Sequence, residues 1–341
     1  MLKKEFANIK YYQAAVALGL AFLFIIVGSF FDLQISQSIV SFGNVFGQIC
    51  AYLGPLPGYV IFGSVGILFF LSNEDGEGKS TFYLSAACLV IFPLLSGALY
   101  GIQVFDETFS SSVLQAFVGI LIVSFCEVGV YFLCRKGNKN DCYTIAITFL
   151  FSFVTVFALL YLLKKAGLRP RYIFLNEIND FSYYRNWWDF DSTVQAAFPD
   201  TASTMFESWP SGHAGLAAFS IVGILYCKLN EKMKGKENIY FYVSLAFTFL
   251  VSFGRVLDGH HFVSDVAFGA FFSYLFAFLV IYLVFLPKPT ESEKEDDEYT
   301  TLIGNYSLCK GTMNSPRQKD IQKKKAQSNI NKKPHKRKKS L

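Results

Sequence analysis

Three segments in the second half of the chain carry basic residues and histidines at spacings suited to phosphate chemistry. The first, KKAGLRPRY, places Lys164 and Arg171 on either side of six other residues. The second, WPSGHAG, and the third, GRVLDGHHFVSD, contain Ser211, Gly212, His213, Arg255, His261 and Asp265. A phosphoryl group in transfer spreads negative charge over three oxygens, so its catalysis depends mainly on positioned cations and hydrogen-bond donors.

The basic residues and the small residues of these segments could form a phosphate site. Arginine offers a planar, bidentate fork, and lysine adds a further cation. The tetrapeptide PSGH precedes an apolar stretch, so a helix beginning there would direct free backbone N–H groups at an anion. A glycine at this point lets the backbone approach a phosphate closely. We therefore expect phosphate to be bound by Lys164, Arg171, Ser211, Gly212 and Arg255.

Together and in this order, the segments resemble the signature of the type 2 phosphatidate phosphatase superfamily, the lipid phosphate phosphatases, which is related to the vanadium haloperoxidases. The family pattern is Lys-x6-Arg-Pro, Pro-Ser-Gly-His and Ser-Arg-x5-His-x3-Asp. The resemblance covers roughly residues 143–286, and Tyr172 and Gly254 depart from it, standing where the family has proline and serine. We expect Gly254 to remove one hydroxyl ligand without changing the chemistry.

The first segment could also be aligned through its Arg169-Pro170 dipeptide. Seven positions before Arg169 stands Leu162 rather than a lysine. The alignment of Lys164 with Arg171 is therefore preferred.

The histidines and the aspartate have separate expected roles. His261 and Asp265 are four residues apart, which would place both on one helical face. The carboxylate could then hold the imidazole in one tautomer and stabilise its cationic form. We expect His261 to be the nucleophile, forming a phosphohistidine, and His213 to protonate the leaving alcohol. The spacing excludes His260 from the family role, although it could contact substrate.

The composition predicts a membrane protein. The 341 residues are 52% hydrophobic and only 17% charged, and the mean hydropathy is +0.35. Runs of about 20 apolar residues match the thickness of a bilayer when coiled as helix. Eight such stretches lie at about 14–31, 56–72, 83–101, 113–134, 143–163, 212–228, 239–257 and 265–286. They predict an all-α transmembrane bundle of about eight spans, with a six-helix family core and extra N-terminal helices.

Lys and Arg residues in the short loops indicate the orientation. They gather at the N-terminus and in the loops after the fourth and sixth stretches, and are absent from 32–55 and 102–112. Both termini are therefore expected in the cytoplasm, with the active site on the extracytoplasmic or lumenal face. Three parts are predicted: N-terminal transmembrane helices at 1–142, a catalytic core at 143–286 and a cytoplasmic tail at 287–341.

The tail is expected to be disordered, because it is too polar to bury a core. It is first acidic and then basic. The basic part could touch anionic lipid headgroups, and no nucleic-acid fold is implied. Its last residues, Lys338 to Leu341, resemble a dilysine signal, which predicts the endoplasmic reticulum in a eukaryote. Otherwise the plasma membrane is expected.

The expected function is hydrolysis of a lipid phosphate monoester such as phosphatidate, without metal or cofactor. The histidines lack partner carboxylates or cysteines at metal-ligand spacing. The alternatives are a polyprenyl or dolichyl diphosphate phosphatase, a phosphatase of a soluble sugar phosphate, an inactive lipid-binding relative, and a transporter or channel. Glu127 lies within the fourth apolar stretch, and such a carboxylate is a candidate functional residue. We assign it no role.

Overall fold

The computed structural model describes residues 5–6, 9–73, 78–106 and 108–285. The chain divides into two units, Met1–Leu286 and Pro287–Leu341. The second unit, with the predicted disordered tail and its dilysine ending, lies outside the described residues. Within them the first unit is helical, apart from the short antiparallel pair β1 (Glu5–Phe6) and β2 (Ile9–Lys10). The expected all-α class is confirmed.

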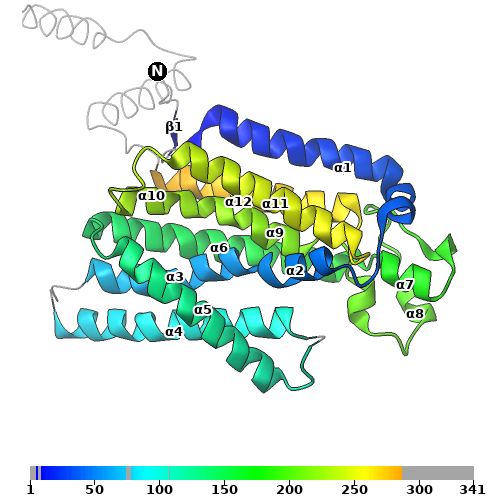
Figure 1. Ribbon diagram of the computed structural model, residues 1–341, viewed down its shortest axis with the longest axis horizontal. Coiled ribbons are helices and arrows are strands. Elements are labelled where there is room, and N and C mark those ends of the chain that lie inside the picture. The colour runs from blue at the N-terminus through cyan, green and yellow to red at the C-terminus, as the bar shows by residue number, and fades with distance from the viewer. Residues whose placement is uncertain (1–4, 7–8, 74–77, 107, 286–341) are drawn as a thin grey trace, which may run out of the picture. The chain divides into compact units, whose positions relative to one another are not determined.

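The helices differ widely in length (Figure 1). The long ones are α1 (Tyr11–Ile39), α3 (Leu56–Ser72), α4 (Lys79–Val104), α5 (Ser112–Cys134), α6 (Lys139–Gly167), α11 (Glu237–Leu257) and α12 (Val263–Phe285). The short ones are α2 (Val45–Leu53), α7 (Tyr172–Glu177), α8 (Thr193–Ala197), α9 (Gly212–Phe219) and α10 (Tyr226–Leu229). Three 3-10 helices complete the set: η1 (Phe181–Tyr183), η2 (Ser203–Phe206) and η3 (Ser220–Leu225).

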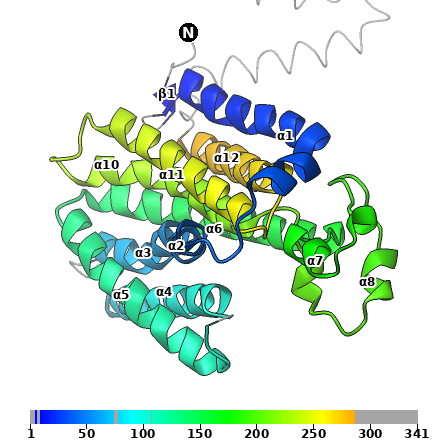
Figure 2. The ribbon, with the colours of Figure 1, turned by 45° about the vertical axis from the view of Figure 1, so that its right-hand side comes forward.

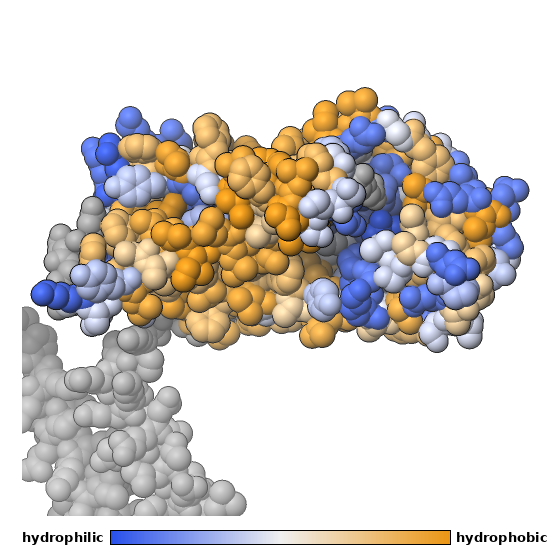
Figure 3. Space-filling model, turned by 90° about the horizontal axis from the view of Figure 1, so that it is seen from below, coloured by the Kyte–Doolittle hydropathy of each residue, from blue (hydrophilic) through white to orange (hydrophobic). Residues whose placement is uncertain are grey.

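Eight helical segments of the described chain are long and apolar enough to cross a membrane. They coincide with the eight predicted stretches, so the multi-pass fold is confirmed. Three spans are composite: α2 continues into α3, the span Lys139–Glu177 comprises α6 and α7, and α9, η3 and α10 form one rod from Gly212 to Leu229. Figure 3 shows apolar side chains over the middle of the molecule and hydrophilic ones at its two ends. This distribution suits a bundle whose middle lies in the hydrocarbon core of a bilayer.

The rod that begins with α9 lies at the centre of the bundle. It packs against α12 and α11 on one side and against α3 and α6 on the other. Figures 1 and 2 show α1 outside α12, and α4 and α5 on the opposite side of the molecule, beyond α3. Gly269 of α12 lies so close to α9 that a Cβ there would come 2.2 Å from the carbonyl oxygen of Ser211. The first turn of α9 is therefore held tightly by α12.

A cap of short elements covers one end of the bundle. It comprises α7, α8, η1, η2 and the loops between them, between the ends of α6 and α9 (Figure 1). Its own small core contains Phe174, Val194 and Phe206, and it packs on Phe262 at the entrance to α12. The cap therefore joins the end of α6 to the ends of α9, α11 and α12.

Candidate active site

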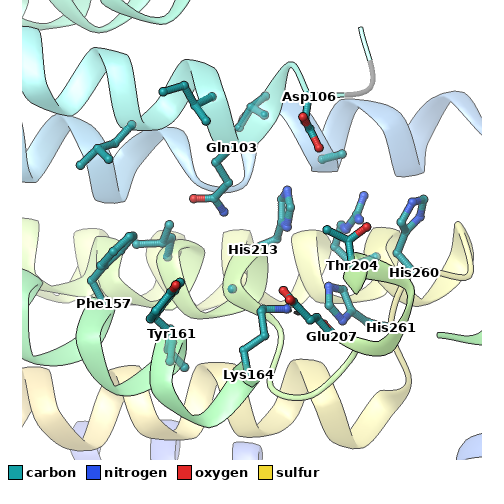
Figure 4. A pocket seen from close by; sticks show the side chains of 18 of the residues that line it. Gln103, Asp106, Phe157, Tyr161, Lys164, Thr204, Glu207, His213, His260 and His261 are labelled. Atoms are coloured by element: carbon teal, nitrogen blue, oxygen red, sulfur yellow. Dashed lines mark hydrogen bonds between the residues drawn. The ribbon is translucent and has the colours of Figure 1, made fainter. Parts of the chain in front are cut away.

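Under the cap, six of the eight predicted site residues line one pocket of about 530 Å³. They are Lys164, Arg171, Gly212, His213, Arg255 and His261. The other two, Ser211 and Asp265, are fully buried and are not among the lining residues. His260 also lines the pocket, as the sequence allowed. Figure 4 shows His213, His261 and Lys164 gathered on one side of it.

Helix ends deliver these side chains to the pocket. Lys164 lies in the last turn of α6, whose C-cap residue Leu168 has a left-handed φ of 46°. Arg171 is the N-cap residue of α7, and its backbone N–H donates to the carbonyl of Met205 in the cap. Arg255 lies in the last turn of α11. Chain segments far apart in sequence therefore meet because their helices end at one level.

Ser211 immediately precedes α9, and its side chain binds the first turn of that helix. It is the N-cap residue of α9, and its hydroxyl accepts a hydrogen bond from the backbone N–H of Ala214 at 3.4 Å. Its own N–H donates to the carbonyl of Asp265 at 2.9 Å. The start of the helix, with Gly212 and His213, thus faces the pocket, where unpaired N–H groups favour an anion.

His261 is buried, with 1% of its surface exposed. Its Nδ1 lies 2.7 Å from the backbone carbonyl oxygen of Ser208. A carbonyl can only accept, so the proton is on Nδ1 and the lone pair of the neutral ring is on Nε2. Burial lowers the pKa of His261 well below its ordinary value, and the nearby cations lower it further. The ring centroids of His213 and His261 are 6.5 Å apart.

The predicted contact between Asp265 and the imidazole of His261 is wrong. The carboxylate accepts from Ser208 Oγ at 2.6 Å and from the backbone N–H of Phe262 at 2.8 Å, and it pairs with Arg169. The helix α12 begins at Val263, so His261 precedes it and the four-residue spacing does not place the two side chains on one face. Asp265 instead fixes the loop whose Ser208 carbonyl binds the imidazole.

A buried charge cluster that the sequence analysis missed lies behind the pocket. Arg169 is 1% exposed and bridges two carboxylates, Asp265 and, at 2.9 Å, Asp32 of α1. Asp32 also accepts from the backbone N–H of Ser264 at 2.9 Å, at the first turn of α12. A carboxylate at the edge of an apolar stretch is costly unless it is paired. The presence of Asp32 at the end of the first apolar stretch could therefore have indicated a buried basic partner such as Arg169.

Of the pocket cations, Arg255 forms an ion pair with a carboxylate of the described chain and Lys164 does not. Lys164 Nζ donates to the backbone carbonyl of Glu207 at 2.6 Å and forms no ion pair with any described residue. Arg255 donates to the carboxylate of Asp258 at 2.6 Å. Asp258 therefore offsets the charge of Arg255, whereas Lys164 brings its charge to the pocket without a carboxylate partner among the described residues.

Gly254 does not face the pocket. A Cβ at this position would lie 2.6 Å from both Cβ and Sγ of Cys50 in α2. The glycine therefore permits close packing of α2 on α11. The position has no access to a pocket ligand, so the expected loss of a hydroxyl ligand does not apply.

The N-terminal helices supply the opposite wall of the pocket, which no motif indicated. Tyr59 of α3, Gln103 of α4 and Asp106 just beyond α4 face the histidines (Figure 4 labels the last two). The same pocket has an apolar part, formed by Ala51, Leu99, Ile102, Val104, Phe157, Leu160 and Leu216. Cations and histidines therefore meet hydrocarbon within one cavity.

The fold and this pocket define a multi-pass helical membrane protein with a cationic, histidine-containing site suited to a phosphate group. Residues 141–288 match the family model of the PAP2 superfamily. The match confirms the resemblance of this segment to the type 2 phosphatidate phosphatases. Members of the superfamily are phosphatases, and the family suggests one of the phosphatidate or lipid phosphate type. No curated protein and no solved structure matches the chain.

Proposed function

We propose that the chain is a membrane-embedded phosphatase that hydrolyses a lipid phosphate monoester, such as phosphatidate, through a phosphohistidine. The observation that carries this proposal is a pocket in which three histidines and three cations adjoin an apolar wall. A phosphate monoester of a lipid combines the same two properties in one molecule.

In the first step, Lys164, Arg171 and Arg255 bind the phosphate oxygens. The neutral Nε2 of His261 attacks phosphorus, because Nδ1 is held by the carbonyl of Ser208. The bond from phosphorus to the alcohol oxygen breaks, and His213 donates a proton to the departing alcohol. The developing charge on the equatorial oxygens is stabilised by the cations and by the backbone N–H groups that begin α9.

In the second step, water replaces the alcohol. His213 is now neutral and accepts a proton from the water as its oxygen attacks phosphorus. The bond between phosphorus and Nε2 of His261 breaks, and inorganic phosphate leaves. Both histidines then regain their starting states, as a catalytic cycle requires.

The apolar part of the pocket supports a lipid substrate. Phe157 and Leu160 of α6 line it together with Leu99 and Ile102 of α4, and both helices are candidate membrane spans. Burial of hydrocarbon there contributes roughly 0.8 kcal/mol per CH₂ group. A soluble sugar phosphate would leave this surface without a partner.

The proposed topology follows the distribution of Lys and Arg. We place both termini in the cytoplasm and the pocket on the lumenal or extracytoplasmic side. The basic tail would contact anionic headgroups of the cytoplasmic leaflet, and its dilysine ending would direct the protein to the endoplasmic reticulum in a eukaryote.

Phosphate release by the detergent-solubilised full chain tests the function. The assay contains excess chelator and compares phosphatidate, a polyprenyl diphosphate and a sugar phosphate, with His261→Ala as control. We expect turnover of phosphatidate that persists in chelator and disappears in the variant. A clear preference for the diphosphate or the sugar phosphate would refute the proposal of a lipid phosphate monoester as substrate. Absence of turnover on all three by folded protein would favour an inactive lipid-binding relative.

A further inference from the structure

Gln103, near the end of α4, lies outside the segment that matches the PAP2 superfamily. Its side chain projects into the pocket toward His213 (Figure 4). The amide nitrogen Nε2 is 3.8 Å from the point that a Cβ on Gly212 would occupy. The amide therefore lies close to the first turn of α9, where the phosphate site is proposed.

Tyr59 fixes the orientation of this amide. Its hydroxyl donates to Gln103 Oε1 at 2.5 Å, and the tyrosine itself is 1% exposed. Its ring packs on Tyr100 and Phe153, with centroids 5.9 and 5.7 Å away. Because Oε1 is bound by Tyr59, the NH₂ group is the part of Gln103 presented to the pocket. That nitrogen makes no hydrogen bond to any residue the structure describes.

The position of Gln103 relative to the histidines determines what it can touch. His213, the proposed general acid, lies between Gln103 and His261 in Figure 4. In an in-line displacement the leaving oxygen departs on the side opposite the nucleophile. With Nε2 of His261 as the nucleophile, the amide would adjoin the leaving alcohol, on the opposite side of phosphorus.

We propose that Gln103 is a specificity-determining residue that donates a hydrogen bond from Nε2 to an oxygen of the leaving alcohol close to the phosphate. This inference rests on the proposed function and names its substrate class: phosphate monoesters whose alcohol carries an acceptor oxygen near the phosphate, as an acylated glycerol does. A polyprenyl phosphate has only hydrocarbon there. It would cover the amide without offering it a hydrogen-bond partner, which costs free energy. Tyr59 is the positioning residue for this amide.

The test compares kcat/KM for phosphatidate and for a polyprenyl monophosphate with the full chain in detergent. Gln103→Ala should lower kcat/KM for phosphatidate about tenfold, as expected for the loss of one desolvated hydrogen bond. The value for the polyprenyl monophosphate should not fall and should rise a few-fold, because the variant no longer has an amide that this substrate leaves unpaired. Gln103→Leu keeps the volume, and should give the same loss. Equal loss on both substrates, or no loss on either, would overturn the inference.

A double-mutant cycle tests the role of Tyr59. Tyr59→Phe should lower kcat/KM for phosphatidate in the same direction, and should have no further effect in a Gln103→Ala background, since the two residues act through one amide. The matched control is Tyr100→Phe, which removes the hydroxyl that donates to the carbonyl of Tyr52 at 2.9 Å and keeps the ring. This control should leave the substrate preference unchanged. Additive effects of Tyr59→Phe and Gln103→Ala would refute the positioning role.

The outcome is separable from failure of the proposed function. If the wild-type chain releases no phosphate from either monoester, the function itself fails. If it turns over both, and His261→Ala abolishes this while Gln103→Ala leaves the preference unchanged, only the inference on specificity fails.

Discussion

His261 donates its Nδ1 proton to the backbone carbonyl oxygen of Ser208, with 2.7 Å between the two atoms. A main-chain carbonyl carries no charge that titrates, so this contact fixes the tautomer at every pH at which the ring is neutral. It leaves Nε2 as the basic nitrogen for the pocket. A backbone carbonyl therefore orients the proposed nucleophile. The carboxylate of Asp265 acts indirectly, by binding the hydroxyl of Ser208.

Asp265→Asn should be more damaging than Ser208→Ala. The asparagine keeps the size of the side chain but leaves buried Arg169 with one charged partner fewer, which we expect to cost about 3 kcal/mol of stability. The alanine removes only the hydroxyl that donates to Asp265 and keeps the carbonyl that binds His261, so about 1 kcal/mol is expected. Thermal unfolding in detergent would measure both. Similar losses in the two variants would contradict the assigned arrangement.

Asp32→Asn should weaken the attachment of α1 to the catalytic segment. Asp32 pairs with buried Arg169 and binds the first turn of α12, so the change removes charge from both contacts. We expect a loss of about 3 kcal/mol, seen as a lower unfolding temperature. Asp200→Asn, at an exposed position of the cap, is the matched control. A shift no larger than that of the control would refute the account.

The acid limb of the pH profile should lie below the ordinary histidine range. Burial lowers the pKa of His261, and Lys164, Arg171 and Arg255 disfavour its protonated form. Attack requires the neutral ring, so kcat/KM should stay high as the pH falls through 6.5 and decline only as the pH approaches the lowered pKa. The measurement is kcat/KM against pH with folded protein confirmed at each point. A decline centred above 6.5 would mean that His261 is not the group that must be neutral.

Gly254→Ser, which restores the serine of the family pattern, should destabilise this chain. Its Cβ would stand 2.6 Å from Cβ and Sγ of Cys50, and such overpacking costs about 1–3 kcal/mol. Cys50→Gly should recover part of the loss by making room in α2. Gly129→Ser in α5, where a Cβ meets nothing within 4 Å, is the control and should be nearly neutral. A more active, equally stable Gly254→Ser protein would show that position 254 faces substrate.

The sequence was sufficient for features that depend on local pattern. Apolar runs of bilayer length predicted the eight spans, and the spacing of Lys164, His213 and His261 predicted a common pocket. The sequence did not predict features that depend on contacts between distant helices. The partner of Asp265 depended on α12 beginning after His261, and the positions of Tyr59 and Gln103 depended on how α3 and α4 pack. No periodicity or spacing connects those helices to the motifs.

Trapping the covalent intermediate tests the central claim most directly. His213→Ala should still react with p-nitrophenyl phosphate, whose leaving group needs no proton, but should hydrolyse the phosphoenzyme slowly. Mass spectrometry of the quenched protein should then find an acid-labile, alkali-stable phosphate on His261, absent when His261→Ala is added. Phosphate on another residue, or its persistence in the double variant, would contradict the assignment of His261 as nucleophile.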